Sequence, residues 1–140
     1  MTRKEKAQQL FLTYNCAQAT VGAFTDILGM EEPALRLVSG LGTGVGGMQL
    51  TCGTLLGAAM VIGSVYADET GSNKAVVSAE VRAFAQRFAA QNRSLLCSEL
   101  LPQAIENRDP SLPGRPCLRY VWNAVELLTQ TLGVSEEFPE

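Results

Sequence analysis

Apolar residues recur every three or four positions along most of this chain, which is the spacing of amphipathic helices. The first stripe predicts a helix over about residues 3–28. Similar stripes predict helices over about 73–91 and 116–132, each with polar residues on its other face. Shorter runs predict brief helices at 33–39 and 94–101, the second ending near a proline. No stretch alternates as a half-buried strand would.

The stretch 37–67 differs from the rest because it contains no charged side chain. Its first part, 39–47, is a glycine-studded loop, and its second part, about 48–66, is apolar nearly all the way round. A helix of that kind lies inside a protein or inside a bilayer. A span needs about 20 mostly apolar residues, and this window is interrupted by polar residues and glycines. We therefore expect a buried central helix and no membrane association.

These elements predict an all-α fold. A chain of 140 residues is long enough to bury a core as a single domain, 1–140. We expect a helical bundle of four longer helices plus one or two short ones, packed around the buried central helix at about 48–66. The proline-rich segment 102–116 is the main irregular connection.

Composition narrows the classes of function. The net charge is −3 and neither sign is clustered, so we expect no nucleic-acid partner. The chain starts with an amphipathic run rather than a leader peptide, which predicts a cytoplasmic protein with reduced thiols. There is no histidine, which excludes Ser-His-Asp and Cys-His catalysis and histidine-ligated zinc within this chain, and no haem is expected.

The candidate chemistry lies in four cysteines, Cys16, Cys52, Cys97 and Cys117. No pair has C-x-x-C spacing, so neither a zinc ribbon nor a thioredoxin motif is present. The last three fall in predicted first turns of helices, where the partial positive charge lowers a thiol pKa and favours the metal-binding thiolate. Two interpretations stay open: one shared cysteine site, or four unrelated buried thiols.

The glycine-rich loop has three interpretations. It binds phosphate through free N–H groups at a helix start, although it matches neither of the known phosphate-loop motifs. It is a tight connection whose glycines permit unusual backbone angles, or it turns N–H groups toward a cofactor held by Cys52. On the third interpretation Gly46 and Gly47 are cofactor-binding residues, because hydrogen bonds to sulfur tune metal clusters.

The order of these features resembles the C-GCAxxG-C-C family of redox-active proteins. The run NCAQA around Cys16, the glycine-rich loop leading to TCGTLLGA around Cys52, and the lone Cys97 and Cys117 carry the resemblance, from about residue 10 to 125. Locally the chain departs from the name motif, with threonine before Cys52, glycine after it, and the closing glycine one position late.

The resemblance implies a small helical protein with electron-transfer or thiol redox activity. Its relatives include the split-Soret cytochromes c, where a similar region accompanies haems and an iron–sulfur centre. Because this chain has no histidine, only the iron–sulfur part is expected to carry over. Cys16, Cys52, Cys97 and Cys117 are then the expected metal ligands.

Three hypotheses follow for function. The first is electron transfer to a redox partner protein through a cysteine-bound iron–sulfur cluster. The second is a metal-free thiol–disulfide redox protein. The third is a non-catalytic helical interaction module with structural cysteines. A symmetric homodimer is compatible with all three, given 46% hydrophobic residues in so short a chain.

Overall fold

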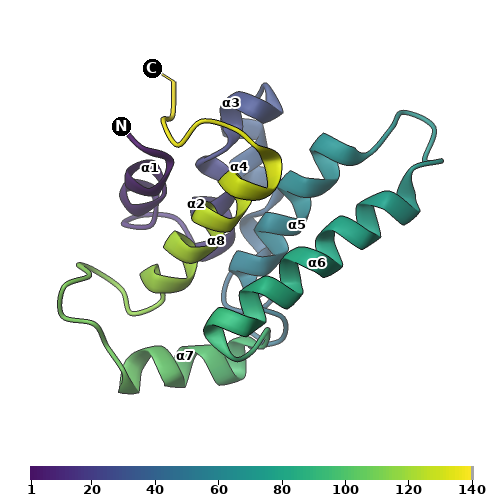
Figure 1. The fold of residues 1–140 in the computed structure, drawn as a ribbon. Helices are drawn as coiled ribbons and strands as arrows, with labels where there is room; N and C mark the ends of the chain where they lie inside the picture. Colours follow the sequence, from purple (N-terminus) through teal and green to yellow (C-terminus); the bar gives the residue numbers. More distant parts are fainter. Residues whose placement is uncertain (140) are drawn as a thin grey trace.

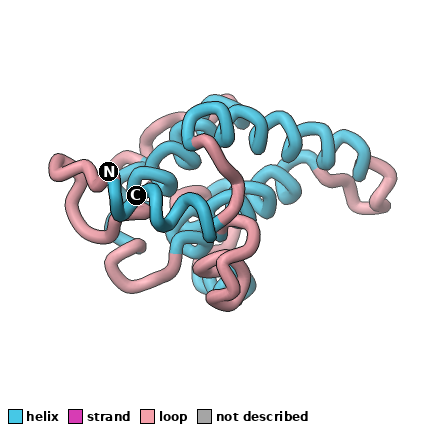
Figure 2. Tube along the Cα trace, turned by 90° about the horizontal axis from the view of Figure 1, so that it is seen from below, coloured by secondary structure: helices cyan, strands magenta, loops and turns pink. Residues whose placement is uncertain are grey.

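A computed structural model describes residues 1–139 and confirms the all-α fold, with helices and no strand among these residues (Figures 1 and 2). The elements in chain order are α1 (Arg3–Leu10), α2 (Cys16–Gly22), α3 (Thr25–Leu28), α4 (Glu32–Leu37), the 3₁₀ turn η1 (Ser39–Leu41), α5 (Gly53–Tyr66), α6 (Lys74–Asn92), α7 (Cys97–Glu106) and α8 (Leu118–Leu132). In the described part of the chain, no helix is long and apolar enough to cross a membrane.

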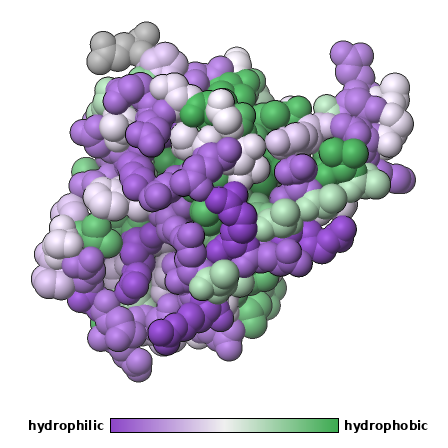
Figure 3. All heavy atoms as spheres, viewed as in Figure 1, coloured by the Kyte–Doolittle hydropathy of each residue, from purple (hydrophilic) through white to green (hydrophobic). Residues whose placement is uncertain are grey.

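The predicted central helix is α5, which contacts α2, α6 and α8 (Figure 1). It starts at Gly53, later than the expected 48, because residues 42–52 form an irregular loop. Its buried positions include Leu55, Ala58, Val61 and Ile62. Hydrophilic side chains cover most of the face that α6 and α8 present in Figure 3, as expected for amphipathic helices around a buried one.

The predicted single helix over 3–28 is wrong. The chain leaves the first helix after Leu10 and restarts at Cys16. Asn15 caps the new start: its side chain accepts the Gln18 N–H at 2.9 Å, and the Gln18 side chain accepts the Asn15 N–H at 3.1 Å. This reciprocal capping box is a strong local signal for a helix start. Cys16 thus begins a helix instead of lying in the middle of one.

A second correction concerns α7, which does not stop near Pro102 but continues to Glu106. Proline lacks the N–H that would pair four residues back. The helix nevertheless continues, with the Asn107 N–H donating to the Gln103 carbonyl at 3.0 Å. Burial of Leu100 and Ala104, on either side of the proline, keeps this segment packed.

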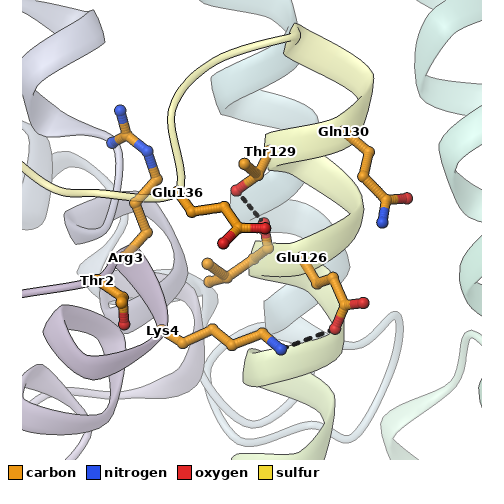
Figure 4. A pocket seen from close by; sticks show the side chains of 8 residues that line it. Thr2, Arg3, Lys4, Glu126, Thr129, Gln130 and Glu136 are labelled. Carbon is orange, nitrogen blue, oxygen red and sulfur yellow. Dashed lines mark hydrogen bonds and ion pairs between the residues drawn. The ribbon is translucent and has the colours of Figure 1, made fainter.

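The two ends of the chain are fastened together on α8 (Figures 1 and 4). The buried Arg3 side chain donates to both carboxylate oxygens of Asp26, at 2.7 and 2.9 Å, and to the Ser135 carbonyl. Lys4 pairs with Glu126 at 2.8 Å, as Figure 4 shows. These contacts join the start of α1 to α3, to α8 and to the segment that follows α8.

Candidate cysteine cavity

The four cysteines, distant in sequence, all line one cavity of about 170 Å³. Cys16 and Cys97 are the first residues of α2 and α7, and Cys52 and Cys117 are the N-cap residues of α5 and α8. All four are free thiols; Cys52 and Cys97 are buried, and the other two are half-buried. Four different helices therefore start at this cavity with a sulfur.

Backbone pairing holds Cys52 and Cys97 next to each other. The Cys52 N–H donates to the Leu95 carbonyl at 2.8 Å, and the Cys97 N–H donates to the Leu50 carbonyl at 2.7 Å. These two bonds form a short antiparallel bridge between the segments that precede α5 and α7. The relative position of the two sulfur-bearing residues is thus set by main chain rather than by flexible side chains.

Cys16 reaches the start of α5 because Gly53 has no side chain. A Cβ at Gly53 would lie 2.7 Å from Cys16 Sγ and 2.6 Å from the Leu41 carbonyl oxygen, both closer than real contacts. One turn later a Cβ at Gly57 would lie 2.8 Å from the Ala17 carbonyl oxygen. The two glycines therefore allow α2 to cross α5 closely enough to bring Cys16 beside Cys52.

Arg115 connects the segment of Cys117 to the segment of Cys16. Its guanidinium donates to the carbonyls of Phe11 and Tyr14, at 2.9 and 3.0 Å, and lies 3.8 Å from the centre of the Phe11 ring. Arg115 also lines the cavity, where it is the one charged side chain among the lining residues. Its positive charge offsets a small part of the rise that burial causes in the pKa of Cys117.

The expected lowering of the thiol pKa values is not what the structure gives. Burial raises the pKa of Cys52, and the N–H groups of Leu55 and Thr54 at the start of α5 lower it only in part. Burial and then the neighbouring Cys16 raise the pKa of Cys97. Helix starts favour thiolates as predicted, but desolvation of the charged form outweighs them here.

Cys117 has the largest shift. Burial, followed by the proximity of Cys16, Cys52 and Cys97, raises its pKa to about 12, against the smaller lowering effect of Arg115. The ionisation of Cys117 is thus coupled to all three other sulfurs, which reflects how closely the four thiols are grouped. At neutral pH the Cys117 thiol is protonated when nothing is bound.

Gly46 and Gly47 do not line the cavity. Their N–H groups donate within the loop, to the carbonyls of Gly40 at 2.8 Å and Gly42 at 3.2 Å. They are therefore not free to reach the Cys52 sulfur in this structure. The loop instead coils through left-handed backbone angles and contributes Thr43 to the cavity wall.

The four thiols fit one kind of metal centre better than another. Among residues 1–139, no three cysteine, aspartate or glutamate side chains are arranged to hold one metal ion. A single tetrahedral zinc would need its four sulfurs about 3.8 Å apart, given Zn–S bonds of about 2.3 Å. Four thiols around a cavity match the number and type of donors of an iron–sulfur cluster, which distributes its cysteines over several metal ions.

The sequence does not predict the three hydroxyl-bearing residues of the cavity as site residues. Thr43 comes from the loop, Thr54 from the first turn of α5, and Tyr120 from α8, where its hydroxyl donates to the Leu100 carbonyl at 2.6 Å. Thr54 follows Cys52 by two positions, so a helix start at Cys52 was the signal that could have identified it. The other two had no sequence signal.

Comparison with known proteins gives one family. Residues 14–131 match the model of the family described as "Putative redox-active protein (C_GCAxxG_C_C)". No curated protein and no solved structure matches the chain. The matched residues contain all four cysteines of the cavity. The chain therefore belongs to the C_GCAxxG_C_C family of redox-active proteins.

Proposed function

We propose that this chain is an electron-transfer protein in which Cys16, Cys52, Cys97 and Cys117 bind an iron–sulfur cluster. The proposal is carried by the grouping of the four thiols at one cavity, each from a different helix start. Four cysteine thiolates are the common ligand set of such clusters. Membership of a redox-active family supports a redox role for these thiols over simple packing.

The surroundings of the cavity suit a negatively charged group. The N-terminal ends of α5, α7 and α8 carry partial positive charge, and Arg115 adds a full one. Most other lining residues are apolar, and in a medium poor in water these charges act more strongly. A bound cluster would supply one-electron chemistry, and the chain would hold its sulfurs, exclude water and stabilise the negative charge.

A metal-free thiol–disulfide protein is the second candidate, since the four adjacent cysteines are free. In that reaction two thiols join as a disulfide and release two protons and two electrons to an oxidised partner. The attacking form is the thiolate, whereas burial raises the pKa of Cys52, Cys97 and Cys117. Slow attack is expected from such thiols, so we favour the cluster.

Anaerobic purification tests the proposal directly. We expect a brown protein with visible absorption and with bound iron and sulfide. We expect Cys52→Ala to lose the visible absorption and the bound iron and sulfide. Thr43→Ser, which alters the cavity wall without removing a sulfur, serves as the control and should keep its iron. A colourless, iron-free protein after anaerobic cluster reconstitution would refute the proposal.

Thiol titration addresses the second candidate on the same samples. Two or four thiols lost after mild oxidation, and restored by reductant, would establish a disulfide cycle. Four titratable thiols under both conditions, together with no iron, would leave the third hypothesis, an interaction module in which the cysteines only pack.

A further inference from the structure

Thr54 stands out among the buried threonines. Its side chain is 1% exposed, and its hydroxyl has no hydrogen-bond partner. The other three, Thr20, Thr25 and Thr129, each donate to a carbonyl three or four residues earlier in the chain. Figure 4 shows this bond for Thr129, which donates to Val125 at 2.7 Å. A buried unpartnered hydroxyl is costly, so its position calls for an explanation.

The location of Thr54 explains why its hydroxyl has no partner. It is the second residue of α5 and lines the cysteine cavity. The carbonyl four positions earlier, that of Leu50, already accepts the Cys97 N–H at 2.7 Å. Cys52 is the N-cap residue of the same helix, two positions before Thr54, and it lines the same cavity. Burial raises the pKa of Cys52, and the Thr54 hydroxyl offsets part of that rise. A neutral thiol is a weak acceptor, whereas a thiolate is a strong one.

We propose that Thr54 is a positioning residue whose hydroxyl donates to the Cys52 sulfur when that sulfur holds the cluster. The hydroxyl is then unpartnered only in the cluster-free state. The inference rests on the proposed function. A hydrogen bond to a ligand sulfur favours the more negative, reduced state of a cluster, so it raises the reduction potential.

Redox titration of anaerobically loaded protein tests the effect on the cluster. Thr54→Val keeps the shape and removes the hydroxyl, and we expect a lower reduction potential. Thr54→Ser keeps a donor and should stay at the potential of the unchanged protein. Thr129→Val is the matched control, since it removes a buried hydroxyl remote from the cysteines. Equal potentials in all four proteins would overturn the inference.

The result for Thr54 can be told apart from the result for the cluster. If no variant binds iron, the proposed function fails, and the role of Thr54 fails with it. If every variant binds iron and all the potentials are equal, only the role of Thr54 fails.

Melting temperature separates this role from a structural one. Because the hydroxyl has no partner in the cluster-free protein, Thr54→Val should melt at the same or a higher temperature. Thr129→Val loses a formed hydrogen bond and should melt lower. Thr54→Ala provides a second hydroxyl-free variant if valine disturbs the helix start. A clear loss of melting temperature in Thr54→Val, similar to that of Thr129→Val, would indicate a structural hydroxyl and contradict the proposal.

Discussion

The missing side chain at Gly53 determines how close Cys16 can come to α5. The sulfur occupies the space where a Cβ would be, and the Leu41 carbonyl closes the other side. The Leu41 carbonyl is main chain and cannot move easily, whereas the Cys16 side chain can turn away from the cavity. Gly63, in the same helix, has only Val77 near its Cβ position, at 3.9 Å. The two glycines form a natural pair for comparison.

Gly53→Ala should destabilise the fold and displace Cys16, whereas Gly63→Ala should not. Overpacking costs about 1–3 kcal/mol, while alanine in place of an interior helical glycine gains up to about 1 kcal/mol. Urea unfolding gives the free energy of each variant, and iron analysis gives the effect on the site. Equal stability of the two variants would show that Cys16 moves away without cost.

The ionisation of Cys117 predicts how stability depends on pH in the cluster-free protein. Its pKa is about 12 in the folded state and 9.0 for an ordinary thiol. Between these values the unfolded chain has already released the proton, so it is favoured as pH rises. The contribution of the Cys117 thiol to the free energy of unfolding is therefore fully present below pH 9. It should be lost progressively as the pH rises toward 12.

Cys117→Ala should flatten this alkaline slope, as measured by urea unfolding at several pH values. The comparison uses the slope and not the absolute stability, so any cavity left by the substitution does not matter. Burial also raises the pKa of Tyr120. Part of the alkaline slope should therefore remain in Cys117→Ala. An unchanged slope would mean that Cys117 ionises as readily in the folded chain as in the unfolded one.

At the scale of elements, each cysteine lies at the start of a helix. The apolar stripe over 3–28 predicts one helix because the periodicity persists across the break between α1 and α2. The sequence contained the opposing signal in Asn15 and Gln18, which have the spacing of a capping box. The capping box of Asn15 and Gln18 sets the start of α2, although the apolar periodicity continues across this boundary.

Asn15→Ala should loosen the start of α2 and with it Cys16. The substitution removes the cap and also the bond from the Asn15 side chain to the Ser39 carbonyl at 2.9 Å. Loss of an N-cap costs about 1 kcal/mol. Chemical denaturation measures this loss, and iron content should fall with it. Asn15→Ser, which can cap the helix but cannot reach as far, should lie between the two proteins.

Other features could not be obtained from sequence, for reasons that are physical. Periodic apolar stripes predict α6 and α8, a charge-free apolar run predicts α5, a short apolar run predicts part of α7, and the shared site is one of two open interpretations. The sign of the pKa shifts is not predictable from sequence, because it depends on how deeply each thiol is buried. The path of the glycine-rich loop depends on hydrogen bonds within it, such as that from the Leu50 N–H to the Gly44 carbonyl.

At the scale of the whole molecule, the cavity is where four otherwise separate segments meet. Cys16 follows α1, Cys52 ends the irregular loop 42–52, Cys97 follows α6, and Cys117 ends the long connection after α7. The Cys52–Cys97 bridge and the contacts of Arg115 also join these segments. A group bound to all four sulfurs would therefore cross-link the fold.

Loading the cluster should therefore raise the melting temperature strongly and should slow hydrogen exchange first in the connection 107–117. A ligand that binds only the folded state stabilises it by about 4 kcal/mol at 1,000 times its dissociation constant, and the unfolded chain offers no preformed site. Calorimetry and hydrogen exchange on loaded and cluster-free protein measure both effects. Cys117→Ala should remove the difference between the two states at 107–117. If loaded and cluster-free proteins melt alike, the four thiols do not share a bound group, and the helix starts are held by packing alone.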